Sequence, residues 1–288
     1  MILPWLCPPL AAQARDSVHA LEGVVVAGRR IGAAGGASGI VVNPDSLSLR
    51  PAATVEDALR ELPFVHVRQN SRGMAEISVR GSESRQVAVL LDGVPLSLAW
   101  DHRTDPSVIP LLGVRSLSLV RGLPSLLGGP NVLGGVVEVD VGRGAGREEN
   151  AVRAMAGWDD AGHRAAGASA TGVAGRWVAR AGAGFRSRDG LALPRAVIDS
   201  AGHGGLRANS DVEQASAFGV ARWEGPARSW VSLSGSAFRA ERGVPPELHL
   251  AAPRLWRIPQ EWQGVAALTA GSGRRRTAWG TGEVEASL

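Results

Sequence analysis

The stretch that decides the fold runs from Ile77 to Val139 and reads ISVRGSESRQVAVLLDGVPLSLAWDHRTDPSVIPLLGVRSLSLVRGLPSLLGGPNVLGGVVEV. Within it, two apolar runs, Val87–Leu91 and Val94–Leu98, flank the dipeptide Asp92-Gly93. Asp-Gly suits the positive backbone angles of a type I′ turn. The segment therefore predicts a β-hairpin.

Further strand and turn signals follow the hairpin. Val114–Val120 alternates between two sets of side chains, which suits a strand with two unlike faces. The next segment, residues 122–135, holds too many Gly and Pro residues for a helix or an unbroken strand, so we expect a tight loop there. The β-branched run from Val136 to Val141 can then resume a buried sheet.

The order of these blocks resembles the plug domain of the TonB-dependent outer-membrane receptors. In that family, I-x-[IV]-R-G is followed by L-x-D-G-[VI]-P and then by R-G-P-x-S-x-x-Y-G-x-x-A-[IL]-G-G-[VI]-[VI]. Ile77–Gly81, Leu90–Pro95 and Arg121–Val137 occupy these blocks. The turn residues that the resemblance implies are Gly81, Asp92, Gly93, Gly122, Gly134 and Gly135.

The resemblance also implies a function. A receptor of this family lies in the outer membrane of a Gram-negative bacterium, where its lipid-facing barrel surrounds the plug. It binds a scarce small molecule, such as a ferric siderophore, haem or cobalamin, and imports it with energy delivered by a TonB-like periplasmic protein. The resemblance implies neither catalysis nor a cofactor. In such a receptor, plug arginines can pair with barrel carboxylates. Arg80, Arg115 and Arg121 are the candidates, and the alternative is ordinary solvent exposure.

The loop Trp100, Asp101, His102 and Arg103 resembles a ligand-facing loop at the plug apex, and the alternative is a solvated loop.

The N-terminal segment predicts export and a partner contact. Residues 1–14 are apolar and end in Ala12-Gln13-Ala14, which fits a signal-peptide cleavage site. In the segment 15–44, which we expect to be a TonB-box-like strand and a linker, the strand candidate consists of Leu21, Glu22, Gly23, Val24, Val25 and Val26. Such a strand can bind a periplasmic partner by β-augmentation. The alternative is the first strand of the plug.

The expected plug domain covers residues 45–142 and is a small α/β domain. Thr54–Leu62 carries an N-cap threonine with Asp57 three residues on and apolar residues at helical spacing, so it predicts a short amphipathic helix that Pro63 ends. Val65–Arg68 and Met74–Arg80 are the strands expected next.

Beyond the Gly-rich boundary at residues 142–150, alternating segments predict about seven antiparallel strands of a transmembrane β-barrel. In Arg176–Phe185, the side chains from Trp177 to Phe185 at alternate positions should face lipid, and Arg176 and Arg180 the lumen. Val152, Ala154, Ala156 and Trp158 form a similar face, as do Val231, Leu233 and Ala237. The further strand candidates are residues 164–174, 212–223, 261–270 and 277–288.

The segment 150–288 is too short for the 22 strands of a plugged transporter barrel, so we expect an incomplete barrel, from a fragment or a truncated gene. An alternative is a soluble periplasmic binding or signalling module built on the plug.

Composition excludes several other functions. An apolar fraction of 44% and a mean hydropathy of +0.02 are typical of a folded protein. Cys7 is the single cysteine, so neither an intramolecular disulfide nor a thiolate metal cage can form. The only basic run, Arg274–Arg276, is too short to indicate nucleic-acid binding. No nucleotide-binding, metal or serine-nucleophile motif occurs.

Overall fold

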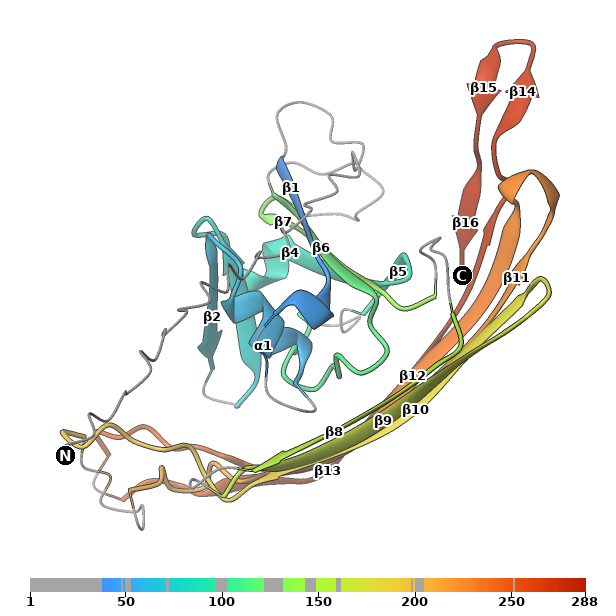
Figure 1. The fold of residues 1–288 in the computed structure, drawn as a ribbon. Coiled ribbons are helices and arrows are strands. Elements are labelled where there is room, and N and C mark those ends of the chain that lie inside the picture. Colours follow the sequence, from blue (N-terminus) through green and yellow to red (C-terminus); the bar gives the residue numbers. More distant parts are fainter. Residues whose placement is uncertain are drawn as a thin grey trace, which may run out of the picture.

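The computed structural model describes residues 38–288 apart from residues 48, 50–52, 71–72, 97–102, 122–131, 143–148, 159–161, 198, 200–204 and 251. The predicted signal peptide, the strand Leu21–Val26, Gly122 and the loop residues 100–102 lie outside the described residues. An N-terminal domain lies on the concave side of a strongly curved sheet (Figure 1).

The N-terminal domain is a mixed α/β unit, as predicted. Its five-stranded sheet has the order β1-β6-β7-β4-β5, in which β4 and β7 are parallel and the other pairs antiparallel, and β2 and β3 form a separate hairpin. Its elements are β1 (Ser38–Val42), η1 (Pro44–Ser46), α1 (Val55–Arg60), β2 (Val65–Gln69), β3 (Ala75–Val79), η2 (Ser84–Gln86), β4 (Val87–Leu91), β5 (Val94–Pro95), β6 (Ser116–Arg121) and β7 (Gly135–Asp140).

Strand β1 lies inside the segment that we expected to be a linker. It pairs with β6 along its whole length, and Ile40 and Val42 pack against the hydrophobic core. The composition of the small-residue segment before it hid this short apolar strand. The described domain therefore starts at Ser38, before the expected boundary at Asp45.

The predicted hairpin turn is present. Asp92 has φ 49° and Gly93 has φ 87°, the two positive angles that a type I′ turn requires. Strand β5 is only two residues long, and beyond Pro95 the Leu96 N–H still donates a hydrogen bond to the Val89 carbonyl oxygen at 2.9 Å.

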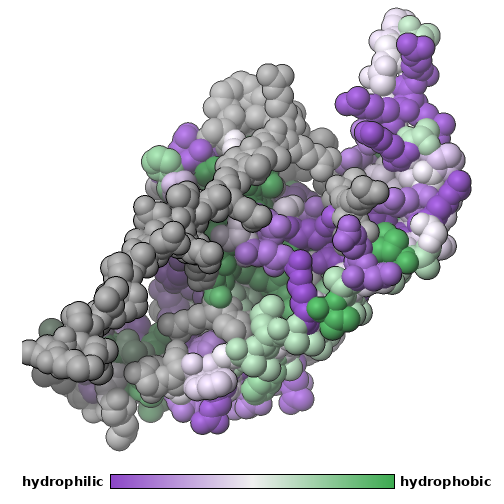
Figure 2. Space-filling view, viewed as in Figure 1, coloured by the Kyte–Doolittle hydropathy of each residue, from purple (hydrophilic) through white to green (hydrophobic). Residues whose placement is uncertain are grey.

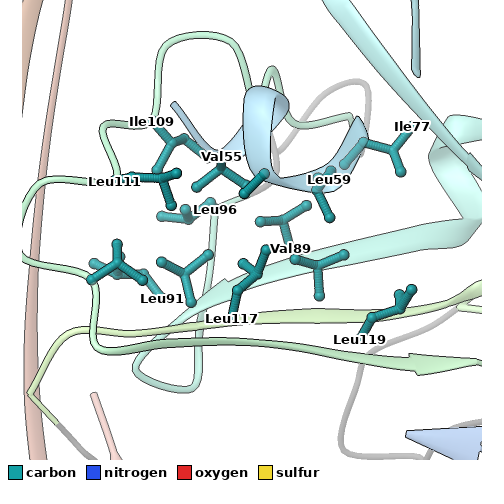
Figure 3. Packing of buried hydrophobic residues seen from close by; sticks show 14 of the residues in the cluster. Val55, Leu59, Ile77, Val89, Leu91, Leu96, Ile109, Leu111, Leu117 and Leu119 are labelled. Carbon is teal, nitrogen blue, oxygen red and sulfur yellow. The ribbon is translucent and has the colours of Figure 1, made fainter. Parts of the chain in front are cut away.

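Helix α1 begins as predicted and ends two residues earlier than expected. The Asp57 carboxylate accepts hydrogen bonds from the Thr54 backbone N–H at 2.8 Å and from the Thr54 hydroxyl at 3.0 Å. Val55, Ala58 and Leu59 lie on its buried face. They pack on the sheet of the domain, where Leu117 and Leu119 of β6 are fully buried (Figure 3).

The second part of the structure is the curved sheet, which has seven antiparallel strands and remains open. Its order is β16-β13-β12-β11-β10-β9-β8, so β8 and β16 form its edges. The strands are β8 (Ala151–Trp158), β9 (Arg164–Ala174), β10 (Trp177–Arg188), β11 (Val212–Glu224), β12 (Trp230–Val244), β13 (Trp256–Gly271) and β16 (Glu285–Ser287).

The last predicted strand, 277–288, is not continuous. Residues 275–282 instead form a hairpin of β14 (Arg275–Thr277) and β15 (Gly280–Gly282), and only β16 pairs with β13. The two-residue turn 278–279 and two glycines in β15 let the chain reverse here.

Connections at the two ends of the curved sheet differ in length. The turn rim has the short connections 175–176 and 225–229 and, after β13, the hairpin-bearing connection 272–284, whereas the loop rim has the connection 159–163 and the long connections 189–211 and 245–255. Arg176, expected to be a lumen-facing strand residue, lies in the turn 175–176.

The convex face of the sheet carries an apolar band, as predicted. Trp177 pairs with Trp223 near the turn rim, and Phe185 and Trp262 lie in one cross-strand row near the loop rim. On β10 the two rows are eight residues apart, or roughly 26 Å at 3.3 Å per residue. With strands tilted by about 35–45°, the rows are about 19–22 Å apart along the membrane normal, slightly less than the ~25 Å apolar band of a membrane β-barrel.

Between the aromatic rows, the convex positions hold only small or aliphatic residues on β10 to β13. These residues are Ala179, Ala181, Ala183, Ala217, Gly219, Ala221, Leu233, Gly235, Ala237, Gly264, Ala266 and Leu268. None of the described helices is long and apolar enough to cross a membrane.

Replacing Leu119 with Ala should destabilise the N-terminal domain by about 2–5 kcal/mol, because the fully buried side chain would leave a cavity between α1 and the sheet. Amide hydrogen exchange of β6 and β7 in detergent measures the loss. Leu133→Ala is the control, since Leu133 is 56% exposed and its truncation should change little. Equal protection in both variants would contradict the assigned core.

Candidate functional site

The candidate site is the contact between the N-terminal domain and the concave face of the curved sheet. Because side chains alternate along a strand, the residues between the lipid-facing alanines point to the concave side. Arg180 of β10 donates hydrogen bonds to the carbonyl oxygens of Val141 at 2.9 Å and Gly113 at 3.1 Å. The prediction that Arg180 faces the lumen is therefore confirmed.

Arg222 makes an equivalent contact from β11. Its Nη1 donates to the Gly142 carbonyl oxygen at 3.1 Å, and its guanidinium lies 4.2 Å from the centre of the buried Trp230 ring. The neighbouring Glu224 carboxylate lies 3.4 Å from Arg222 Nε. The segment that links β7 to the curved sheet is thus bound by arginines of two adjacent strands.

Asp92 joins the hairpin turn to both parts of the structure. Its side chain is fully buried, and its carboxylate accepts hydrogen bonds from the backbone N–H groups of Val141 at 2.8 Å and Gly142 at 3.0 Å. The Ser234 hydroxyl of β12 donates a further hydrogen bond to Oδ2. We assigned Asp92 to the turn alone from the sequence, and the structure adds these contacts.

A buried charge cluster lies nearer the loop rim. Arg242 of β12 donates to the Asp105 carboxylate at 2.9 Å, and the Glu261 carboxylate of β13 lies 3.0 Å from the same nitrogen. Asp105 also accepts hydrogen bonds from the Ser107 hydroxyl at 2.6 Å and from the Ala75 N–H at 3.1 Å. Asp105 and Arg242 are each less than a tenth exposed. Removing either side chain would therefore leave the other as a buried charge with one partner fewer.

The segment following Asp105 is held by two further inward side chains. Arg186 donates to the Ser107 carbonyl oxygen at 2.8 Å and to the Gln214 side-chain oxygen at 2.7 Å. Gln214 in turn donates to the Val108 carbonyl oxygen at 2.9 Å. Side chains from β10, β11 and β12 therefore all bind residues 105–108.

An apolar contact accompanies these hydrogen bonds where the curved sheet comes close to the N-terminal domain. Phe218 of β11 packs into the hydrophobic core of the N-terminal domain. Gly113 lies directly against its ring, and with φ 87° it adopts a conformation that favours glycine. A side chain at position 113 would collide with the ring.

The three predicted plug arginines lie in different environments. Arg80 is exposed in a turn with Gly81, and the Arg121 guanidinium lies 5.1 Å from the centre of the Phe64 ring within the N-terminal domain. Among the described residues, neither forms an ion pair with a carboxylate of the curved sheet. Arg115 lines a polar cavity of about 470 Å³ between the two parts, together with Arg153 and Arg180. A barrel-binding role for these arginines stays a prediction.

Of the other predicted residues, two glycines have a clear steric reason. Gly135 has φ 153°, and a side chain there would strike the Val120 carbonyl oxygen, while one at Gly134 would strike Ser82. Arg103, from the expected ligand-facing loop, lies 3.8 Å from the Glu76 carboxylate.

Sequence reasoning missed the residues that make most of the contacts. These are Asp105, Arg186, Gln214, Arg222, Ser234 and Arg242. A signal was present, because polar residues on β11 and β12 alternate with the predicted lipid-facing ones. The sequence could not identify the partners of these polar residues, because the partners lie up to 142 residues away in the chain.

The fold and this contact define a class of protein. An α/β domain seated by polar contacts on the concave side of a sheet whose convex face is apolar is the arrangement of a plugged outer-membrane barrel. A family model described as "TonB-dependent Receptor Plug Domain" matches residues 33–136.

Known proteins agree with this assignment. The vitamin B12 transporter BtuB of Photobacterium profundum is 35% identical over 100 residues, which is 34% of this chain and 16% of that protein. The copper transporter OprC superposes with a TM-score of 0.65 at 17% identity, over 86% of this chain and 36% of OprC. The FrpB iron transporter of Neisseria meningitidis gives a TM-score of 0.65 at 14% identity, over 82% of this chain and 38% of FrpB.

Residues 33–136 therefore match the plug domain of the TonB-dependent receptors, and the curved sheet has the fold of part of the barrel wall in the solved structures. This family consists of receptors and transporters of the Gram-negative outer membrane, and the chain is assigned to that membrane. The chain spans less than two fifths of the length of these relatives.

Asp92→Asn should weaken the contact by about 1–3 kcal/mol, because the amide has one acceptor oxygen and no charge to offer two N–H groups and a hydroxyl. Hydrogen exchange of the Val141 and Gly142 amides should accelerate. Asp45→Asn is the control, because the Asp45–Arg153 ion pair is exposed and contributes little. Unchanged exchange at both amides would refute the assigned role of Asp92.

Asp105→Asn should weaken the contact between the N-terminal domain and the curved sheet by about 2–3 kcal/mol. This is less than the 3–5 kcal/mol usual for breaking a buried ion pair, because Arg242 keeps Glu261 as a partner. Protease sensitivity of residues 103–110 in detergent reports the loosening. Glu56→Gln, which removes an i,i+4 pair with Arg60 on the surface of α1, should change the sensitivity little. A double-mutant cycle with Arg242→Gln should reveal coupling; additive effects would argue against the pair.

Proposed function

We propose that this receptor binds a scarce small molecule outside the cell and imports it when a TonB-like periplasmic protein pulls on the N-terminal segment. The observation that carries the proposal is the nature of the plug contact. Arg180, Arg186 and Arg222 bind it through backbone carbonyl oxygens. Hydrogen bonds of this kind can exchange with water, so a plug held by them can be displaced without unfolding the barrel wall.

The orientation follows from the connections between strands. In outer-membrane barrels the short turns face the periplasm and the long loops face outward. The turn rim of the curved sheet is then periplasmic and the loop rim extracellular. The Arg242–Asp105–Glu261 cluster lies toward the loop rim, so it would be on the side from which the ligand arrives.

The cargo is a small molecule of the kinds that related proteins carry. The relatives are named as transporters of vitamin B12, copper and iron, and other structural neighbours as siderophore receptors. We propose a metal chelate, either a ferric siderophore, haem or cobalamin.

The alternative of a soluble periplasmic module is not favoured. Its convex face would expose Trp262, Leu233, Leu268 and the alanines between them to water, a continuous apolar surface that soluble monomers rarely carry. In a membrane, lipid covers this apolar surface and keeps it from water.

Deleting Leu21–Val26 should abolish uptake by cells that express the receptor and leave ligand binding intact, because the segment would transmit force and touch no ligand. Uptake and surface binding of a ferric siderophore and of cobalamin are measured side by side.

Val25→Pro and Val25→Ala form a matched pair for the same test. β-Augmentation uses backbone N–H groups, so proline should block uptake and alanine should not. Normal uptake by the deletion variant would count against the proposed coupling.

A further inference from the structure

A hairpin at the turn rim extends well beyond the curved sheet. Strand β13 ends at Gly271, and β14 and β15 then form a separate two-stranded unit with residues 278–279 as its turn. Figure 1 shows this hairpin standing past the end of the seven-stranded sheet. The transport function proposed above leaves it without a role.

The hairpin concentrates cationic and aromatic side chains. Arg274, Arg275 and Arg276 are all exposed, and Trp279 in the turn is 98% exposed. Much of the projection is hydrophilic (Figure 2). Arginine and tryptophan are the residues that most often dominate binding surfaces, and an indole that is wholly in water has an unfavourable apolar area.

The opposite strand leaves these side chains accessible. Arg275 pairs across the hairpin with Gly282, and Arg276 with Thr281, so small residues lie opposite these two arginines, and Arg275 Nε donates a hydrogen bond to the Ser272 carbonyl oxygen at 3.2 Å. Glu283 directly follows Gly282 and so lies beside the arginines, and Glu285 pairs with Gly271 at the base of the hairpin. The outer end of the hairpin is therefore positively charged and offers a flat backbone surface beside an indole.

The length of the hairpin distinguishes two anionic partners, the lipid headgroups and the peptidoglycan. Trp279 lies eight residues beyond Gly271, about 26 Å along the strand direction and about 18 Å from the apolar band when the strands tilt by about 45°. A headgroup layer is only about 5–8 Å thick on each side of the bilayer. The tip thus extends past the lipid headgroups into the periplasm.

We propose that the β14–β15 hairpin binds the peptidoglycan layer, a glycan cross-linked by short peptides that carry carboxylates. Arg274–Arg276 pair with the peptide carboxylates, and the Trp279 ring packs on the apolar face of a sugar. This contact anchors the barrel beneath the outer membrane. It rests on the orientation given above and not on transport.

Co-sedimentation with purified peptidoglycan sacculi tests the proposal, using the full chain in detergent micelles. The unmodified protein should pellet with the sacculi. The triple variant Arg274→Gln, Arg275→Gln and Arg276→Gln, and separately Trp279→Ala, should each bind about tenfold more weakly. Amidation of the peptidoglycan carboxylates should weaken binding of the unmodified protein to the same extent.

Matched controls come from the opposite rim. Arg254→Gln and Trp256→Ala remove an exposed arginine and an exposed tryptophan at the loop rim and should leave sedimentation unchanged. Hydrogen exchange of β13 should be the same in all variants, which shows that the sheet stays folded. Vesicles of phosphatidylglycerol serve as the competing anionic surface.

The proposal is overturned if the unmodified protein does not sediment, if the hairpin variants sediment equally well, or if hairpin-dependent binding occurs only on the vesicles. Because no ligand or TonB protein enters the assay, these outcomes are separate from a failure of the transport proposal.

Discussion

The buried carboxylate of Asp92 is the constraint on which the arrangement depends. It belongs to the β4–β5 turn, binds the backbone where β7 ends and accepts a hydroxyl hydrogen bond from β12. A buried carboxylate must have such partners, because desolvation of an unpaired charge is costly. One side chain therefore fixes the hairpin, the exit of the chain from the plug and the distance of the plug from the wall.

The wall contributes the arginines of this contact and the plug mainly the acceptors. Long arginine side chains can reach from a smooth strand surface to backbone carbonyl oxygens in a loop-rich domain. The plug segments at the contact expose such oxygens because their turns leave them outside the sheet. The resulting interface is polar at Arg180 and Arg222 and apolar only at a few points, such as Phe218.

Sequence patterns predicted the elements well where the periodicity was local. The type I′ turn, the Asp57-capped helix and the convex faces of β10 and β12 all depend on residues close together in the chain. The predictions were wrong where the pairing between strands decided whether a segment forms a strand. Strand β1 forms because β6 offers a free edge, and the expected strand 277–288 breaks because a two-residue turn and glycines favour a hairpin.

By itself, the sequence determined the fold class, the plug motif and the division into a mixed domain and an alternating β region, because these follow from turn chemistry and side-chain period. Only the tertiary structure decided which polar residues meet. Ser234 lies 142 positions from Asp92, and Arg242 lies 137 from Asp105, in strands whose register sets their height on the wall. A single-residue shift in that register would turn both side chains toward lipid, and no local pattern specifies their partners.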